Sequence, residues 1–339
     1  MKSKLLDSWY DRIPKVELHL HLEGAIPLDA LWTLIQKYGG DSSVQNINAL
    51  QDKFQFRDFS HFLENWAWKN SFLREYEDFT FISEAIAKDL SNQNLKYVEA
   101  FFSPVDFEMS GLHPSRIAES IRTGLSKVSG IEVSLIVDLV RDTKIKKAEN
   151  FLDQIYEVKE LGIIGIGIGG AEHDFPPSRF KDIYQKARHY DFRTTAHAGE
   201  AAGADSIWGA IRKLKVDRIG HGTRAFEDES LLDYLAEHQI PLEMCPISNV
   251  CTGVIQNIES HPIKEFINRG LAVTVNTDDP KMFNNSLAEE YMNLEKIFEL
   301  SRKEIQRLIL QGIKSSWQSE NKKNKLINNF QNNPNWIQD

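Results

Sequence analysis

The sequence predicts an α/β fold, a (β/α)8 TIM barrel with extra helices inserted after the first strand. Eight short apolar runs alternate with helical patterns along the chain, which is the element order of such a barrel. No linker, low-complexity block or internal repeat divides the 339 residues. We therefore expect one domain over residues 1–339, with a barrel core of about 14–315 and a peripheral C-terminal tail over 316–339.

Each predicted strand is a short run dominated by apolar residues. The eight runs are 16–22, 97–103, 133–139, 163–168, 192–197, 217–220, 240–244 and 271–276. In a barrel of this type the functional groups lie at the carboxyl ends of the strands. Polar residues that end or directly follow these runs are therefore the candidates for a site.

Helical patterns separate the strands. Four of them are 114–128, which begins with a proline, 144–159, 230–237 and 262–268. The long gap between the first two strands holds three more, at 28–38, 59–72 and 77–90, which we expect to cover the barrel mouth. The many aromatic residues of this gap are expected mainly to pack, although a few could form the wall of a pocket for a flat ligand.

Composition excludes several classes of function. The net charge is −9 and no basic stripe occurs, which argues against nucleic acid as a partner. No run of about 20 apolar residues could span a membrane, and the segment 1–9 lacks the apolar stretch of a signal peptide. We expect a cytoplasmic protein that does not bind membranes, and the sequence gives no indication of its oligomeric state.

The two cysteines, Cys245 and Cys251, are too few for a disulfide scaffold and are not spaced as a zinc knuckle. We interpret both as reduced and structural. Because Cys245 follows a predicted strand, it could instead line the site or contact the metal.

The first strand carries a histidine pair. Side chains two residues apart on a strand point to the same face, so His19 and His21 converge while Val16, Leu18 and Leu20 face the other way. A His-x-His pair occurs often by chance, so the later segments decide whether it binds a metal.

Three later strands also end in polar clusters. His197 and Glu200 stand at the end of the fifth strand, His221 at the end of the sixth, and Asp278 and Asp279 after the eighth. A lone histidine is usually a hydrogen-bonded core residue, and Asp-Asp-Pro is usually a turn. Four such clusters at strand ends favour a shared site, and imidazole together with carboxylate suits a borderline divalent metal such as zinc.

These segments resemble the signature motifs of the adenosine/adenine deaminases, a branch of the metal-dependent amidohydrolases. They occur in the order of that family and cover most of the chain: Pro14–Gly24, His197–Glu200, Gly220–Gly222, Ser248–Asn249 and Asn276–Pro280. The resemblance implies a hydrolase that acts on C–N bonds of cyclic amidines in purine metabolism and releases ammonia.

The resemblance also implies a role for each site residue. His19, His21, His197 and Asp278 would bind one Zn²⁺ per chain. Glu200 would protonate the purine N1, and His221 would orient or deprotonate the attacking water. Asp279 would hold N7, the backbone of Gly170 would approach N3, and His21 and Glu23 would also contact the substrate.

The fourth strand bears on the metal count and on substrate approach. Related enzymes with two metals are expected to have a bridging lysine at its end, and 163–170 contains no lysine, so we expect a single metal. Gly165 and Gly167 are expected to allow close packing, whereas Gly169 and Gly170 lie where bare backbone could approach a ligand.

Two positions depart from the adenosine deaminase pattern. Glu23 stands where many of these enzymes have aspartate, at a position associated with the sugar 5′ side, and Ala171 replaces an acidic residue. We expect a 6-aminopurine nucleoside substrate, either adenosine or a 5′-modified adenosine such as aminodeoxyfutalosine. Free adenine is the alternative substrate, and Glu23 could instead only brace the loop after the first strand.

Two other functions are consistent with the barrel. Hydrolysis of an amide or phosphoester would use the same metal but would not need an acid that faces a purine nitrogen. A non-catalytic barrel with a structural zinc would not need the acid-base pair that Glu200 and His221 supply.

Overall fold

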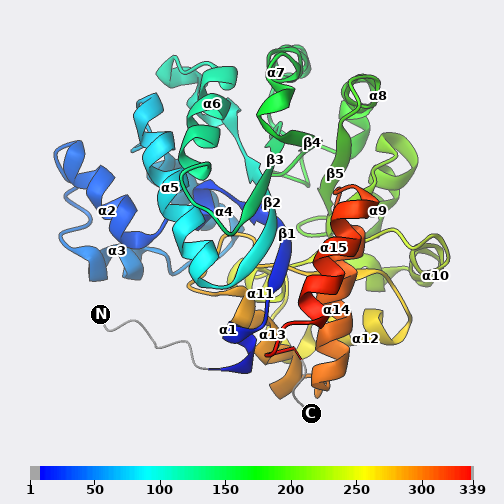
Figure 1. Ribbon diagram of the computed structural model, residues 1–339. Helices are drawn as coiled ribbons and strands as arrows, with labels where there is room; N and C mark the ends of the chain where they lie inside the picture. Colours follow the sequence, from blue (N-terminus) through cyan, green and yellow to red (C-terminus); the bar gives the residue numbers. More distant parts are fainter. Residues whose placement is uncertain (1–7, 337–339) are drawn as a thin grey trace.

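In the computed structural model, eight parallel strands pair in chain order to form a barrel, which confirms the predicted fold (Figure 1). The strands are β1 (Lys15–His21), β2 (Leu95–Phe102), β3 (Glu132–Asp138), β4 (Ile163–Gly167), β5 (Arg193–Ala198), β6 (Arg218–His221), β7 (Leu242–Met244) and β8 (Val273–Val275). The structure describes residues 8–336. The first seven and last three residues of the predicted domain, with most of the segment 1–9, lie outside the described residues.

The residues after β8 close the barrel against β1. The Leu18 amide donates to Oδ1 of Asn276 at 2.8 Å, and the His21 amide donates to the carbonyl of Asp278 at 2.8 Å. The Asp278 amide in turn donates to the carbonyl of His19 at 3.1 Å. Because both the amide and the carbonyl of Asp278 form hydrogen bonds with β1, its side chain is fixed next to the two histidines of that strand.

The helices surround the barrel. They are α1 (Trp9–Arg12), α2 (Leu28–Lys37), α3 (Ile47–Lys53), α4 (Phe59–Asn70), α5 (Tyr76–Asn92), α6 (Pro114–Leu125), α7 (Ile145–Tyr156), α8 (Lys181–His189), α9 (Ala204–Gly209), α10 (Glu229–His238), α11 (Pro246–Cys251), α12 (Ile263–Asn268), α13 (Leu287–Lys296), α14 (Arg302–Ser315) and α15 (Glu320–Gln331).

All seven predicted helices form. The pattern over 144–159 ends early, at Tyr156, because a short 3-10 segment, Lys159–Leu161, and Gly162 turn the chain into β4. The sequence interpretation did not identify the other helices, of which α14 packs against β1 and β8.

The inserted helices α2 to α5 lie on one side of the barrel (Figure 1). Asp58 caps the start of helix α4, because its side chain accepts a hydrogen bond from the His61 amide at 2.8 Å. It packs against the 3-10 segment η2 (Pro104–Ser110), which follows β2. This contact brings α4 over the carboxyl ends of the strands.

The C-terminal segment 316–336 is attached to the barrel more closely than the sequence predicted. The Trp317 amide donates to Glu99 at 2.7 Å, and the Trp317 ring lies 3.7 Å from the guanidinium of Arg218. A Cβ on Gly165 would lie 2.5 Å from this ring, so Gly165 serves close packing, as predicted. Phe330 and Trp336 are buried as well, because apolar residues of the polar tail point inward.

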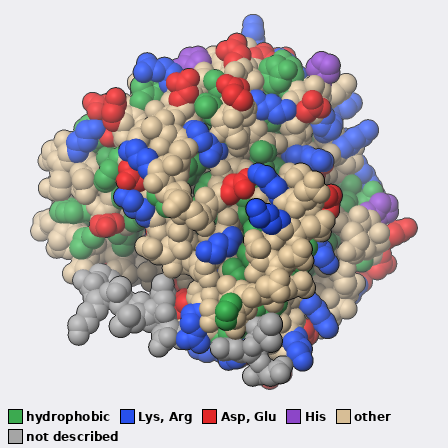
Figure 2. Space-filling model, viewed as in Figure 1, with side chains coloured by type: hydrophobic (Ala, Val, Ile, Leu, Met, Phe, Trp, Pro, Cys, Tyr) green, Lys and Arg blue, Asp and Glu red, His purple; other side chains and the backbone are tan. Residues whose placement is uncertain are grey.

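Acidic and basic side chains are interspersed on the face shown in Figure 2. Among the described residues, no helix is both long enough and apolar enough to cross a membrane.

Candidate active site

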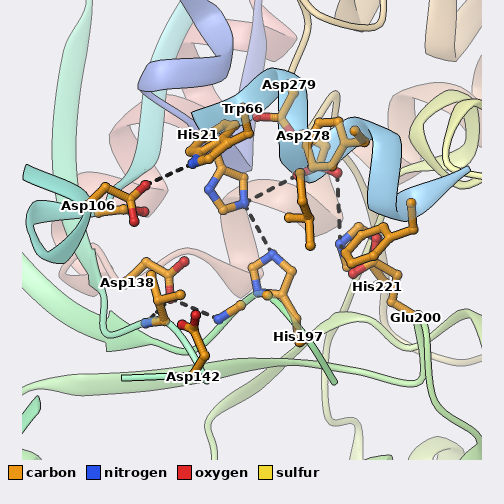
Figure 3. Close-up of a pocket in the computed structure, with 18 residues that line it drawn as sticks. His21, Trp66, Asp106, Asp138, Asp142, His197, Glu200, His221, Asp278 and Asp279 are labelled. Atoms are coloured by element: carbon orange, nitrogen blue, oxygen red, sulfur yellow. Dashed lines mark hydrogen bonds and ion pairs between the residues drawn. The ribbon is translucent and has the colours of Figure 1, made fainter. Parts of the chain in front are cut away.

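The four predicted metal ligands, His19, His21, His197 and Asp278, converge at the carboxyl ends of the strands. Figure 3 shows three of them, His21, His197 and Asp278. Nε2 of His197 lies 3.0 Å from Nε2 of His19 and 3.1 Å from Nε2 of His21. Oδ1 of Asp278 lies 3.5 Å and 3.3 Å from the same two nitrogens of β1. One ligand atom from each residue therefore falls within 4.8 Å of all the others, and all four side chains are buried.

The protons of two of these histidines point away from the cluster. Nδ1 of His19 lies 2.8 Å from the Glu243 carboxylate, and Nδ1 of His197 lies 3.1 Å from the Ile168 carbonyl. Both partners are acceptors, so each Nδ1 donates, and in a neutral ring the Nε2 carries a lone pair. Burial by itself would lower the pKa of His19, but Asp278 and Glu243 raise it to about 10. Two Nε2 lone pairs 3.0 Å apart repel each other unless a cation, either a proton on His19 or a metal ion, lies between them. Three imidazoles and a carboxylate are ligands that suit zinc.

A buried ion pair holds the partner of His19. Arg218 contacts Glu243 at 2.5 Å and Glu99 at 2.6 Å. Burial by itself would raise the pKa of Glu243, but Arg218 and His19 lower it overall. Glu243 is therefore ionised and orients the His19 ring.

Asp278 has an unusual backbone conformation. Its φ is +67°, which costs a non-glycine residue on the order of 1–3 kcal/mol. The Thr277 amide and hydroxyl both donate to Glu17 of β1, at 2.6 Å and 2.5 Å. The Ser248 hydroxyl donates to Oδ2 of Asp278 at 2.6 Å, so Oδ1 is left to face the histidines.

Glu200 and His221 lie beside the cluster, with Oε2 and Nε2 3.5 Å apart. Burial, and then the charges of Asp278 and Glu172, raise the pKa of Glu200 well above its usual range. Burial lowers the pKa of His221 to about 3. These shifts favour a protonated carboxyl beside a neutral imidazole, the form that acid-base chemistry on a bound molecule needs.

Glu172 holds the segment that carries Glu200. One of its oxygens accepts from the Gly199 amide at 2.7 Å, and the other accepts from the amides of Glu200, Ala201 and Ala202 at 3.1, 2.8 and 2.9 Å. Four backbone donors on one carboxylate fix the chain on both sides of Glu200. The sequence did not predict this role.

Arg141 fixes the neighbouring metal ligand. Its guanidinium donates to the His197 carbonyl and to the Phe175 carbonyl. The side chain is fully buried and comes from the loop after β3. Arg141 and Glu172 together determine the path of the chain at the end of β5.

The cluster opens into a cavity of about 250 Å³. Its wall is formed by His21, Phe59, Phe62, Leu63, Trp66, Ser103, Asp106, Asp138, Val140, Asp142, Gly169, Gly170, Ala171, His197, Glu200, His221, Asp278 and Asp279. Three of the aromatic residues come from α4, so part of the inserted segment does form the wall of a pocket. Most of its remaining aromatic residues pack, as Trp68 does on Phe72, whereas Phe81 is exposed.

Three of the four predicted substrate contacts, His21, Gly170 and Asp279, lie in this wall. Oδ1 of Asp279 is buried without a hydrogen-bond partner, and burial followed by the charge of Asp278 raises the pKa of this carboxyl well above its usual range. Only glycine fits at position 24, because a Cβ there would lie 1.8 Å from that oxygen. Gly170 lines the cavity, and its φ of +90° is a conformation that favours glycine, so no side chain covers its backbone there.

The outer part of the cavity is acidic. Asp106, Asp138 and Asp142 all belong to its wall and point toward it in Figure 3. Asp138 is held by the amides of Val140 and Gly169, and burial raises its pKa to about 6. None of the described residues that line the cavity is lysine or arginine. The sequence interpretation did not identify these three aspartates.

Glu23 lies behind the wall and does not form part of it. One of its oxygens accepts from the Ser103 amide at 2.9 Å, and the other has no hydrogen-bond partner. Its carbonyl accepts from the ammonium of Lys69 at 2.7 Å, and burial lowers the pKa of that lysine to about 8. These contacts favour the alternative in which Glu23 braces the loop after the first strand.

Cys245 lies near the cluster but outside the cavity wall. Its sulfur is within 4.8 Å of a nitrogen of His19 and of His221. Burial raises the pKa of its thiol well above the usual range, and the thiol donates to the Glu243 carbonyl. Cys245 is not one of the four residues whose ligand atoms converge with His197 and Asp278. Cys251 is partly buried, and both cysteines are free.

Comparisons with known proteins agree with this geometry. The family model of adenosine deaminase matches residues 14–333. An adenine deaminase of Crocosphaera subtropica is 34% identical over 320 residues, which cover 93% of this chain and 98% of that protein. An aminodeoxyfutalosine deaminase of Streptomyces avermitilis is 30% identical over 317 residues, which cover 92% of this chain and 88% of that protein.

Solved structures show the same architecture. The crystal structure of an adenine deaminase from Arthrobacter aurescens matches with a TM-score of 0.89 and 31% identity, over 94% of this chain and 98% of that one. An amidohydrolase from Burkholderia ambifaria, solved with bound zinc, matches with a TM-score of 0.87 and 26% identity, over 97% of this chain and 94% of that one.

Proposed function

This chain belongs to the adenosine deaminase family of hydrolytic deaminases, and we propose that it uses one zinc ion to remove the 6-amino group of a purine nucleoside. One observation carries the proposal. Glu200 and His221 face each other at 3.5 Å beside four converging metal ligands, at the inner end of a cavity. A structural zinc site has no need of such a pair, and hydrolysis of an amide or phosphoester has no need of a neutral acid that faces a ring nitrogen.

The opposed lone pairs of His19 and His197 support zinc at the cluster. His19, His21, His197 and Asp278 would hold the ion. When bound, zinc would act as a Lewis acid that makes a water nucleophilic near neutral pH. Glu243, the Ile168 carbonyl and Ser248 keep three of the ligands in the required orientation.

Glu200 would donate a proton to N1 of the purine. Burial raises the pKa of this carboxyl, which favours the protonated form before the substrate binds. Protonation of N1 makes C6 electrophilic, and His221 lies where it can contact the attacking water. When the C–N bond breaks, the former amino group takes up a proton and leaves as ammonia, and C6 keeps the oxygen of the water. The two protons that the water loses balance the one gained by ammonia and the one that Glu200 gave to N1.

Asp279 and Gly170 would hold the purine ring. N7 of a purine only accepts hydrogen bonds, so Asp279 must be protonated to bind it, and burial favours that form. The unpartnered Oδ1 is the atom that would carry the proton. The Gly170 amide could donate to N3 because no side chain separates it from the cavity.

The acidic outer cavity supports a nucleoside over a nucleotide. Carboxylates accept hydrogen bonds from sugar hydroxyls, and Asp106, Asp138 and Asp142 offer several such acceptors. An anionic 5′-phosphate would meet like charges there, with no lysine or arginine among the described wall residues. Substrates with a neutral 5′ extension fit this pattern as well.

Free adenine is the second candidate substrate. The relatives from Crocosphaera subtropica and Arthrobacter aurescens are both named adenine deaminase, which favours it. A free base would occupy only the inner part of the cavity, next to Gly170, Glu200 and Asp279.

A screen of ammonia release tests the proposal. The zinc-loaded enzyme is assayed with adenine, adenosine, deoxyadenosine, aminodeoxyfutalosine and AMP, and kcat/KM is compared. We expect a nucleoside to be the best substrate and AMP to be poor. If adenine ranks first, the nucleoside assignment is wrong and the second candidate holds. Absence of ammonia from every purine would overturn the deaminase proposal itself.

A further inference from the structure

We propose that a series of hydrogen bonds, from the Ile263 amide through His261 and Asn249, fixes the neutral tautomer of His221 with its proton on Nε2. His221 then donates a hydrogen bond to the reacting water and does not remove a proton from it. The tautomer follows from the hydrogen bonds alone, whereas the catalytic consequence rests on the proposed function.

The first group of the series can act only as a hydrogen-bond donor. The Ile263 amide can only donate, and it contacts Nδ1 of His261 at 3.2 Å, so this nitrogen must be an acceptor. His261 is buried, and burial lowers its pKa to about 3, which makes the ring neutral. A neutral imidazole that accepts at Nδ1 carries its proton on Nε2. That Nε2 lies 3.1 Å from Oδ1 of Asn249 and donates to it.

The donor at His261 determines which way the Asn249 amide points. The Thr223 hydroxyl also reaches Oδ1, at 2.7 Å, so two donors converge on the same atom. If the amide were reversed, its NH₂ group would face the N–H of His261, and two donors would oppose each other. The NH₂ group of Asn249 therefore points to Nδ1 of His221, at 3.1 Å, and donates to it.

The last step fixes His221. Its Nδ1 accepts from Asn249, so the neutral ring carries its proton on Nε2. This nitrogen faces the site, 3.5 Å from Glu200 and 3.9 Å from Asp278, and it has no hydrogen-bond partner although it is fully buried. A buried N–H without a partner is rare, and an oxygen bound at the reaction centre would satisfy it.

This result decides between the two roles that the sequence left open for His221, orientation or deprotonation of water. A nitrogen that already carries a proton cannot accept another from water unless the ring first loses its own. Asn249 and His261 do not line the cavity, so they act only through His221 and are positioning residues.

Nitrogen NMR of the zinc-loaded enzyme tests the tautomer directly. With ¹⁵N-labelled histidine, and a His221→Gln variant to assign the signals, we expect Nδ1 of His221 to show the shift of a nitrogen without a proton and Nε2 that of a protonated one. A protonated Nδ1, whether in the other neutral tautomer or in a charged ring, would overturn the proposal. The spectrum needs no substrate, so it can succeed even if the proposed deamination fails.

Variants of His261 test the series. His261→Phe removes the donor but keeps an aromatic ring, so we expect mixed tautomers at His221 and a kcat about 10- to 100-fold lower, the scale for lost outer hydrogen-bond partners. KM should stay within a few-fold of its normal value. His261→Gln keeps a donor and should restore both kcat and the spectrum. His238→Phe, an exposed position on α10, is the matched control. Unchanged His221 shifts in His261→Phe would show that His261 does not fix the tautomer.

Discussion

The inner and outer parts of the cavity differ in how firmly their polar groups are held. In the inner part, hydrogen bonds from neighbouring elements fix the reacting groups: Glu243 of β7 fixes His19, and Glu172, in the turn after β4, fixes the segment of Glu200. In the outer part, Asp142 lies in the loop after β3 and is exposed. Asp106 lies in η2 and accepts hydrogen bonds from Trp66 and Asn70 of α4, whose aromatic residues form the apolar part of the wall.

This difference separates the two questions that the site raises. The inner part determines the reaction, because acid-base and metal chemistry require fixed geometry. The outer part determines which purine derivative fits, because it contacts whatever extends beyond the ring. Substitutions in the inner part should therefore reduce kcat for every substrate, and substitutions in the outer part should change the ranking of substrates.

The largest effect is expected at a metal ligand. His197→Ala should abolish turnover, and the zinc content should fall with the activity, because the ligand lies in the middle of the cluster. Metal analysis and ammonia release on the same preparation measure both. His189→Ala, at the exposed end of α8, is the control. Normal turnover without zinc in His197→Ala would refute the assignment of the inner part.

Glu200→Gln should lower kcat by at least ~10², because glutamine keeps the shape but has no transferable proton. Zinc should still bind, since Glu200 is not one of the four converging ligands. Steady-state kinetics with metal analysis separates the two effects. A variant with nearly normal kcat would remove Glu200 from the mechanism.

Glu172→Gln should lower kcat by about 10- to 100-fold, because the amide NH₂ group would face at least one backbone N–H that the carboxylate now accepts. KM should change less than kcat, since Glu172 does not line the cavity. The exposed position Glu237→Gln serves as the control. Equal losses in both variants would mean that Glu172 has no specific role.

The smallest effect is expected in the outer part. Asp142→Asn should raise kcat/KM for AMP relative to adenosine by roughly fivefold, because it removes one like charge that is partly screened by solvent. The kcat for adenosine should stay close to normal. If the substitution instead lowered kcat for every substrate and left their ranking unchanged, the division between inner and outer parts would be wrong.

The sequence was sufficient to predict the inner part because each ligand ends or follows a strand. His19 and His21 share the first run, and Asp278 follows the last one, so the barrel rule alone brings them together. The eight strands were predictable for the same reason, since each is a short apolar run between turns.

The supporting contacts were not predictable. Glu172 accepts hydrogen bonds from backbone N–H groups that lie 27 to 30 residues later in the chain. Because almost every residue has a backbone N–H, the residue types do not show which of them a side chain contacts. His261 is a lone histidine whose role depends on a neighbouring amide. Glu23 was expected near the substrate because of its motif, but its side chain turns toward the Ser103 amide. The tail was expected to be peripheral because it is polar, although Trp317 packs against the barrel.

Titration of zinc-free enzyme with zinc, while ammonia release from adenosine is followed, tests the central claim most directly. We predict that the zinc-free protein is inactive and that activity rises linearly to a plateau at one equivalent of zinc per chain. Full activity without metal, or a plateau only at two equivalents, would contradict the mononuclear zinc site formed by His19, His21, His197 and Asp278.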